Sequence, residues 1–169
     1  DKLDWILGKL REIPHLEFVR IGTKMPAVLP QRITTSLCRV LKKHHPLWMS
    51  IHFTHPSELT PEVTQATARL ADAGIPLGSQ TVLLKGINDN AAVLADLFRT
   101  LLSLRVKPYY LHHADLAPGT SHFRTTVSEG QALMRALRGR LSGLAQPTYI
   151  LDIPGGVSKV PIGPSYIDE

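Results

Sequence analysis

The stretch that decides the fold is LWMSIHF (47–53), followed by TPEVTQATARLADAG (60–74) and PLGSQTVLL (76–84). The first and third segments are rich in apolar and β-branched residues, which is typical of strands in a covered sheet. Between them, Thr60 suits a helix cap, Pro61 suits the first helical position and Gly74 suits the helix end. A strand, a helix and a second strand in this order predict a parallel β/α/β unit.

The same alternation extends in both directions along the chain. Further helices are predicted over 3–10, over 33–41, from a cap at Asn88 or Asp89 to Leu102, and over 128–141. Further strands are predicted over 16–21, 107–112 and 148–152, with an irregular loop over 22–30. Because no low-complexity linker or internal repeat interrupts this order, we predict one unit of β/α repeats over 1–145 and a tail over 146–169.

Polar side chains gather at or just beyond the predicted carboxyl ends of the strands. They are Arg20, Thr23, Lys24, His52, Thr54, His55, Gln80, His112, His113, Asp115 and Asp152. In a β/α barrel these ends form the face on which active sites are built, whereas a complete eight-fold barrel needs about 250 residues. The chain has 169 residues and begins with a helix, so we predict a partial TIM-like (β/α) barrel, as a fragment that lacks its N-terminal part.

Composition limits the classes of function. The hydrophobic fraction is 43%, the net charge is +5, and the basic residues are dispersed except for Lys42-Lys43-His44-His45 at a helix end. A dispersed charge does not favour nucleic-acid binding, and we expect none. The absence of an apolar run of about 20 residues predicts no membrane span, and the acidic start is no signal peptide, so we expect a cytoplasmic protein.

The segment DIPGGVSKVP (152–161) places Lys159 just past a Pro-Gly-Gly turn. Gly155 and Gly156 permit positive φ and close approach of another group. A lysine held behind apolar residues and beside a carboxylate can act as a Schiff-base amine. The alternative is a surface turn followed by a solvated lysine.

Asp115 and Asp152 are predicted to lie on the same face, beyond neighbouring strands. Two nearby carboxylates can bind a cation, share a proton or hold a metal. They can equally cap turns or helices, and either can form a plain ion pair with Lys159.

Other chemical sites have weak support in the sequence. His112 and His113 are adjacent, so in a strand they point to opposite faces and cannot share one metal ion. The single cysteine, Cys38, excludes an intramolecular disulfide and an all-cysteine metal site from this chain, and we expect no bound metal. Neither G-x-G-x-x-G, a Walker loop nor G-x-S-x-G is present.

Taken together, the motifs resemble those of the lysine 2,3-aminomutases, over essentially the whole chain and in the same order. The matching segments are VRIGTKMPAVLPQRIT (19–34), HFTHP (52–56), LGSQTVLLKGIND (77–89), PYYLHHAD (108–115), HFRT (122–125) and DIPGGVSKVP (152–161). This family consists of radical S-adenosylmethionine enzymes that also use pyridoxal phosphate. The resemblance implies the later strands of a (β/α)6-type barrel and a coenzyme-binding tail.

The resemblance also implies roles for individual residues. Lys159 matches the lysine that forms the Schiff base with pyridoxal phosphate. Asp115 and Asp152 match the carboxylates that bind the side-chain ammonium of the substrate L-lysine. His52 and Gln80 match residues of the S-adenosylmethionine pocket. The implied reaction is migration of the amino group from carbon 2 to carbon 3, started by a 5′-deoxyadenosyl radical, in a homo-oligomeric isomerase.

The chain departs from the family pattern in one respect. The C-x-x-x-C-x-x-C motif for the [4Fe-4S] cluster and a Gly-Gly-Asp-Pro segment are absent, and Cys38 belongs to neither. We therefore expect this chain alone to be inactive. Three alternatives stay open: an aminomutase of the elongation factor P pathway, a glutamate 2,3-aminomutase, and a non-catalytic β/α binding module.

Overall fold

The computed structural model describes residues 2–156 and 158–167. The α-helices are α1 (Lys2–Arg11), α2 (Met25–Val28), α3 (Thr35–Lys43), α4 (Pro61–Asp72), α5 (Ala91–Ser103) and α6 (Val127–Leu137). The strands are β1 (Val19–Thr23), β2 (Leu47–His52), β3 (Leu77–Val82), β4 (Val106–His112), β5 (Thr148–Asp152) and β6 (Lys159–Pro161). Short 3-10 turns cover Pro30–Arg32, Pro56–Glu58, Ser121–Phe123 and Gly143–Ala145.

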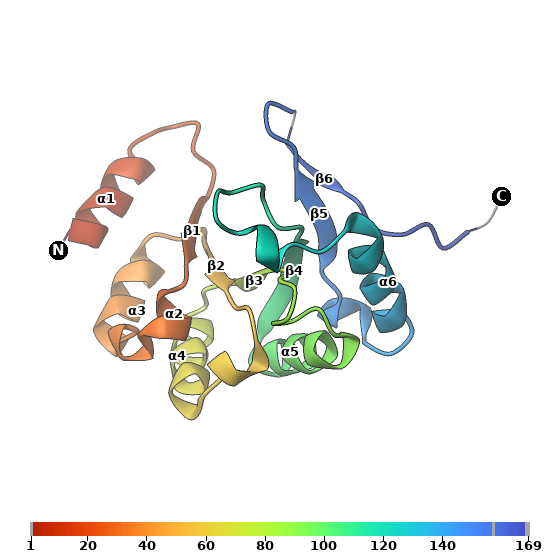
Figure 1. The fold of residues 1–169 in the computed structure, drawn as a ribbon. Coiled ribbons are helices and arrows are strands. Elements are labelled where there is room, and N and C mark those ends of the chain that lie inside the picture. The colour runs from red at the N-terminus through yellow and green to blue at the C-terminus, as the bar shows by residue number, and fades with distance from the viewer. Residues whose placement is uncertain (1, 157, 168–169) are drawn as a thin grey trace.

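All six strands form one sheet in the order β1-β2-β3-β4-β5-β6. Strands β1 to β5 are parallel, and β6 pairs antiparallel with β5. Helices α3, α4, α5 and α6 follow one another around the outside of the curved sheet (Figure 1). The predicted parallel β/α architecture is confirmed. No pairing between β1 and β6 closes the sheet among the described residues, and a barrel stays a prediction.

Helix α4 forms where its capping signals predict it. The Thr60 hydroxyl accepts a hydrogen bond from the Val63 amide, Pro61 occupies the first turn, and Gly74 adopts φ +81° just past the end. The threonine gives a partner to one free amide of the first turn, the proline has no amide hydrogen to pair, and the glycine adopts the left-handed conformation that ends a helix. The β2–α4–β3 unit is therefore specified by local sequence as well as by packing.

Several predicted boundaries are wrong. Strand β1 begins at Val19 rather than at residue 16 and continues to Thr23, and α2 occupies part of the predicted loop over 22–30. Helix α6 ends at Leu137 rather than at residue 141, because Arg138 is extended and Gly139 has φ +79°. The cap of α5 is Asn90, whose side chain accepts hydrogen bonds from the Ala92 and Val93 amides, and not Asn88 or Asp89.

The core lies between the outer face of the sheet and the helices. Its fully buried side chains come from both layers and include Leu47, Ile51, Phe53, Leu70, Leu83, Leu94, Leu97, Phe98, Leu101 and Leu111. Burying one large apolar side chain contributes about 1.5–3 kcal/mol, so this layer supplies most of the stabilisation. No helix within 2–156 and 158–167 is long and apolar enough to cross a bilayer.

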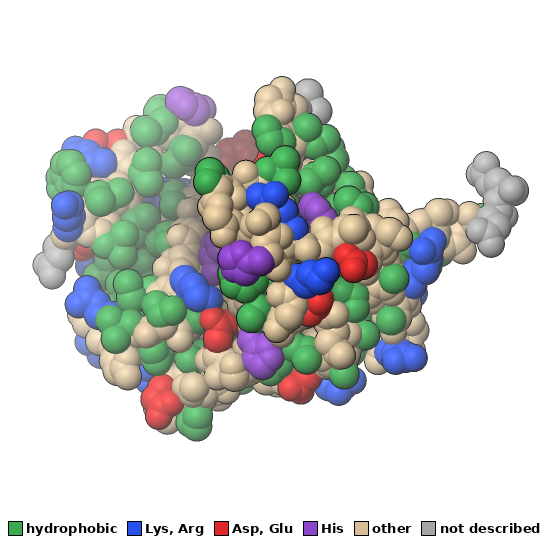
Figure 2. Space-filling view, in the orientation of Figure 1, with side chains coloured by type: hydrophobic (Ala, Val, Ile, Leu, Met, Phe, Trp, Pro, Cys, Tyr) green, Lys and Arg blue, Asp and Glu red, His purple; other side chains and the backbone are tan. Residues whose placement is uncertain are grey.

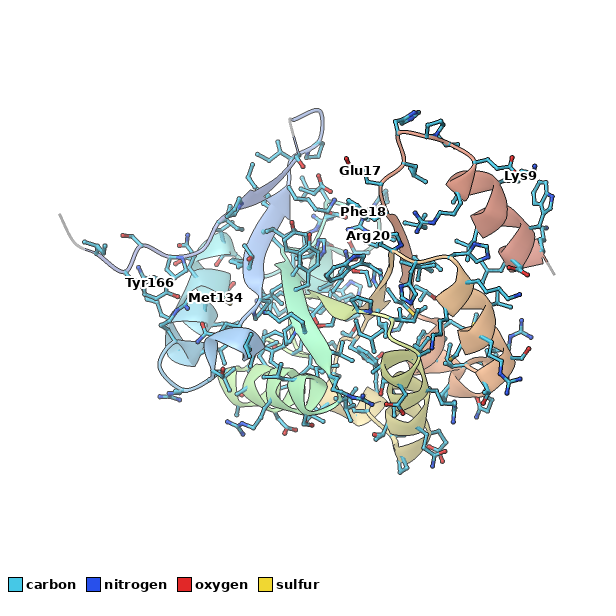
Figure 3. The ribbon with its side chains drawn as sticks, turned by 180° about the vertical axis from the view of Figure 1, so that it is seen from behind. Lys9, Glu17, Phe18, Arg20, Met134 and Tyr166 are labelled. Atoms are coloured by element: carbon cyan, nitrogen blue, oxygen red, sulfur yellow. The ribbon has the colours of Figure 1, made fainter. Side chains whose placement is uncertain are left out.

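The tail after β6 runs along α6. The side-chain amide of Gln131 donates to the Ile162 carbonyl, and Arg135 donates to the Ser165 carbonyl. Figure 3 shows Tyr166 beside Met134 on α6, where the Tyr166 hydroxyl donates to the Met134 carbonyl at 3.4 Å. Strand β6, which carries Lys159, is therefore held by its pairing with β5 and by the tail that follows it along α6.

Candidate functional site

The inner face of the sheet, opposite the helices, carries the aromatic and polar residues. We use this name for the face that bears Arg20, Trp48, His52, Gln80, Tyr110 and His112. Near the amino ends of the strands, this face carries an open hollow of about 840 Å³. Its lining includes Phe18, Arg20, Trp48 and Tyr109. Figure 3 shows Phe18 and Arg20 side by side at the β1 edge of this hollow. Half-exposed aromatic side chains on a sheet face indicate a surface suited to a ligand or to further protein.

His52 and Gln80 lie next to each other on this face. They are partners in the register between β2 and β3, and Gln80 is the partner of Tyr110 in β4. Side chains at paired positions of neighbouring strands point the same way, so the three form one row across the sheet. Burial, with a smaller contribution from Lys24, lowers the pKa of His52, so its imidazole is neutral at pH 7.

A β-bulge shapes the next strand. The register between β3 and β4 shifts between Ser79 and Gln80, which leaves Tyr109 as an extra residue. A bulge changes which side chains face which side of the sheet. The rings of Tyr109 and Tyr110 consequently stack with centroids 3.8 Å apart, although consecutive strand residues normally point to opposite faces. The sequence gives no local signal for this bulge.

His112 and His113 point to opposite faces, as predicted. The His112 ring meets Tyr110 edge-on, with centroids 5.7 Å apart, and its Nε2 is buried without a hydrogen-bond partner among the described residues. The Nδ1 of His113 instead lies 2.7 Å from the hydroxyl of Tyr149.

His112 is surrounded by the charges of the predicted site. Burial lowers its pKa most, Lys159 and His52 lower it further, and Asp115 and Asp152 raise it. Four of the five predicted site residues therefore lie close enough to act on one imidazole. The sequence places His112 at the carboxyl end of a strand, on the face expected to carry the site, but it predicts no role for this residue beyond the metal ligation considered above.

Lys159 and Asp152 are in direct contact. They are partners in the β5–β6 register, and the Lys159 Nζ donates to Asp152 Oδ2 at 2.7 Å. Their side chains are 38% and 46% exposed. The expectation of a lysine sheltered behind apolar residues is wrong, because β6 lies at the sheet edge and leaves its side chain in solvent. The ion pair that the sequence left open is present.

Asp115 and Asp152 line the same cavity. This cavity has a volume of about 430 Å³, and its wall also includes Leu116, Leu151, Ile153 and Pro154. Asp115 is exposed and makes no hydrogen bond or ion pair to any described side chain. An apolar wall between two carboxylates suits a ligand with an aliphatic chain and a cationic end.

A second ion pair supports the same edge of the sheet. Lys24, after β1, contacts Glu58, after β2, at 2.5 Å. Glu58 also accepts hydrogen bonds from the backbone amides of Thr54 and His55, and these bonds and Lys24 lower its pKa against the opposing effect of burial. Sequence reasoning missed Glu58, because the two partners are 34 positions apart. The pair joins the loop after β1 to the loop after β2, which begins just beyond His52.

The described residues contain no group of three or more histidine, cysteine, aspartate or glutamate side chains placed to hold a metal ion. Cys38 is buried in the core. Burial raises the pKa of its thiol, which favours the protonated form over the thiolate. The described side chains at this edge of the sheet include an amine, carboxylates and imidazoles.

Comparison with known proteins adds family information. Residues 134–168 match a family described as lysine-2,3-aminomutase. The chain is 54% identical over 98% of its length to the L-lysine 2,3-aminomutase of Fusobacterium nucleatum, and covers 39% of that protein. It is 52% identical to the L-lysine 2,3-aminomutase of Clostridium subterminale, over 99% of this chain and 40% of the relative. It is 48% identical to the glutamate 2,3-aminomutase of Clostridioides difficile, with the same two coverages.

The chain thus spans about 40% of the length of the curated relatives that it matches. Among solved structures, it resembles a radical SAM methyltransferase from Sphaerobacter thermophilus with a TM-score of 0.58. That likeness covers 79% of this chain and 40% of the other at 22% identity, and it concerns the fold alone.

Proposed function

We propose, from the premise that this chain belongs to the lysine 2,3-aminomutase family, that it provides the substrate and coenzyme edge of an enzyme that interconverts L-lysine and L-β-lysine. One observation carries the proposal. Lys159 contacts Asp152, and Asp152 shares a cavity with Asp115, so an amine and two carboxylates meet at one edge of the sheet. The curved parallel sheet supports placing these residues in a (β/α)6-type barrel.

The two carboxylates would bind the side-chain ammonium of lysine. An ammonium that leaves water needs charge-assisted acceptors to offset its desolvation, and Asp115 and Asp152 supply them. The aliphatic part of the substrate would lie along the apolar wall of the cavity, which includes Leu151 and Ile153. The negative charge of two aspartates disfavours glutamate, whose side chain ends in a carboxylate.

Lys159 would hold pyridoxal phosphate through its Nζ. The geometry fits this role, because the amine is accessible on a hairpin whose turn contains Gly155 at φ +72° and Gly156, where a Cβ would lie 2.9 Å from the Cβ of Ile153. When bound, the coenzyme supplies a conjugated system that stabilises reactive states next to the substrate nitrogen. Lys159 is paired with Asp152, so attachment of the coenzyme to its Nζ would require this ion pair to open.

His52 and Gln80 would contact S-adenosylmethionine. Their side-by-side placement on the inner face supports this assignment, and the neutral imidazole offers both a donor and an acceptor. The residues present do not fit a [4Fe-4S] cluster, which needs several thiolates, because the chain has one cysteine. We therefore assign no step to the cluster here and expect residues 1–169 alone not to turn over lysine.

Borohydride reduction tests the coenzyme assignment. Incubation of the intact protein with pyridoxal phosphate, reduction and peptide mapping should label Lys159 in preference to other lysines. The variant Lys159→Arg should lose the label, whereas Lys85→Arg, which changes another exposed lysine, should keep it. Equal labelling of several lysines would contradict the role of Lys159.

Substrate choice is tested separately by following β-amino acid formation by the intact protein. We expect β-lysine from lysine and no product from glutamate. Turnover of glutamate but not of lysine would overturn the substrate assignment while leaving the coenzyme assignment intact.

A further inference from the structure

A buried tyrosine lies beneath the loop that carries Asp115. Tyr149 in β5 is 1% exposed, and its ring packs on the outer face of the sheet against α6. Its hydroxyl reaches the Nδ1 of His113 at 2.7 Å, and the two rings meet edge-on with centroids 6.0 Å apart. His113 is two residues before Asp115 and lines the same cavity.

Helix α6 has a glycine where this tyrosine needs space. Gly130 is buried inside the helix, and a Cβ at this position would overlap the hydroxyl oxygen and two ring carbons of Tyr149. Glycine within a helix costs about 1 kcal/mol relative to alanine. Three elements, β5, α6 and the loop after β4, are therefore shaped around one phenol.

The hydrogen bond also determines the state of His113. The Tyr149 hydroxyl has Nδ1 of His113 as its sole hydrogen-bond partner among the described residues, so it satisfies its proton by donating to this nitrogen. Burial raises the pKa of Tyr149 to about 12 and lowers the pKa of His113. Both groups are neutral at pH 7, which places the imidazole proton on Nε2.

The loop beyond His113 has few other attachments. The His113 amide donates to the Ile150 carbonyl at 2.8 Å, and the next backbone group of this loop with a hydrogen bond among the described residues is the Ala117 carbonyl, which accepts from the Arg124 side chain at 2.9 Å. Asp115 lies between these two points without a hydrogen-bond partner among the described side chains. The orientation of its carboxylate consequently depends on how the residues at 113 and 117 are fixed.

We propose that Tyr149, in the space left by Gly130, acts as a positioning residue that holds the His113 ring and thereby aligns the carboxylate of Asp115 with a cationic ligand. This inference rests on the proposed function of Asp115. It adds a residue outside the cavity to the binding of the substrate ammonium. Tyr149 itself touches neither substrate nor coenzyme.

A double-mutant cycle in the intact protein tests this role. Lysine binding to the protein loaded with pyridoxal phosphate, without S-adenosylmethionine so that no turnover occurs, is measured by calorimetry. Tyr149→Phe removes one oxygen and should raise the dissociation constant for lysine roughly three- to tenfold, as expected for the loss of one neutral hydrogen bond. The affinity for pyridoxal phosphate should not change.

The second arm asks whether the effect passes through Asp115. In an Asp115→Asn background, Tyr149→Phe should have no further effect on lysine affinity. Tyr166→Phe is the matched control, because it removes a hydroxyl that contacts the Met134 carbonyl on another part of α6, and it should change neither affinity. His113→Asn, which can keep an acceptor near the Nδ1 position, should retain more affinity than His113→Leu.

The outcomes separate two kinds of failure. If Asp115→Asn binds lysine as tightly as the unmodified protein, the proposed function of Asp115 is wrong and the positioning role is overturned with it. If Asp115→Asn weakens lysine binding but Tyr149→Phe does not, or if the two effects add, only the positioning role is wrong. A parallel loss of coenzyme affinity in Tyr149→Phe would also overturn it, since that result indicates a general structural role.

Discussion

The unit from β2 to β4, residues 47–112, and the hairpin of β5 and β6, residues 148–161, are built in different ways. The first is held by side chains such as Leu97 and Phe98, which are 0% exposed, between the sheet and α4 and α5. The end of the second is held by a ladder of three paired positions and an exposed ion pair between Asp152 and Lys159. One region maximises burial, and the other keeps charged groups within reach of a ligand.

The comparison shows where stability and chemistry are separated in this molecule. An exposed ion pair contributes about 0–1 kcal/mol, whereas a buried aromatic side chain contributes several times more. Changes at the exposed end of the hairpin, at Asp152 and Lys159, should therefore affect ligand binding more than folding, and changes in the core should do the reverse. Figure 2 shows lysine, arginine, aspartate and glutamate side chains scattered over this face of the molecule, with apolar side chains exposed between them.

The largest expected effect on stability is in the core. Phe98→Ala removes a 0% exposed aromatic ring from α5 and leaves a cavity beneath β4, so it should destabilise the fold by about 3–5 kcal/mol. Urea unfolding of the intact protein measures this change. Leu116→Ala, at a side chain that is 76% exposed, is the control and should stay within about 0.5 kcal/mol. Equal effects would mean that burial of Phe98 does not stabilise the region from β2 to β4.

Asn88 provides the next test. It is a buried polar residue that bonds to the backbone at the carboxyl ends of β2 and β3. Its Oδ1 accepts from the Leu84 amide, and its Nδ2 donates to the carbonyls of Thr54 and Val82, each within 2.9 Å. Asn88→Ala would leave these groups unpaired in a fully buried position, so we expect a loss of about 2–4 kcal/mol. Asn90→Ala, which removes only the cap of α5, should cost about 1 kcal/mol.

If the two asparagine variants unfold at the same urea concentration, the hydrogen bonds of Asn88 to Thr54, Val82 and Leu84 do not stabilise the protein more than a helix cap does.

The contrast between these two asparagines illustrates what the sequence can and cannot predict. Thr60, Pro61 and Gly74 specify α4 because a helix end is satisfied by residues close to it in the chain. The segment NDN at 88–90 offers three residues that can each cap a helix, and only packing decides which one is buried. Local chemistry therefore predicts that a helix begins here, but not which residue caps it.

The site follows the same division. The grouping of Asp115 and Asp152 was predictable, because parallel strands bring their carboxyl ends to one edge. Strand β6 was missed, because three residues paired antiparallel at an edge have no periodic pattern and are held by β5 and by the tail along α6. The bulge at Tyr109 and the Lys24–Glu58 pair were missed for a related reason, since both arise from contacts between distant parts of the chain.

A smaller effect on stability, with a larger one on binding, is expected in the hairpin. Asp152→Asn replaces a carboxylate that pairs with Lys159 at 2.7 Å in an exposed position, so it should change the free energy of unfolding by less than about 1 kcal/mol. The same change removes one charged acceptor from the proposed ammonium site and should weaken lysine binding about tenfold. Calorimetry with lysine and urea unfolding measure the two quantities separately.

An Asp152→Asn variant that unfolds much more easily but binds lysine normally would reverse the comparison, since the hairpin would then be a structural element. Glu12→Gln is a suitable control, because it removes another exposed ion pair, with Lys9, far from the site in the chain. It should leave lysine affinity unchanged.

The smallest expected effect is a pH dependence of the free energy of unfolding. It arises from His112 and His113, at the end of β4, where the first region ends. Burial lowers the pKa of His112 and of His113 in the folded protein, so each binds its proton less readily when folded than when unfolded. The unfolded chain therefore takes up more protons than the folded protein as the pH falls below the ordinary histidine pKa of about 6.5. The contribution of these two histidines to stability is fully present above that pH and is lost as the pH falls below it. Between pH 7.5 and 5.5, the free energy of unfolding should rise with pH, and His112→Gln should reduce the slope. A slope of opposite sign would mean that these imidazoles gain rather than lose proton affinity on folding.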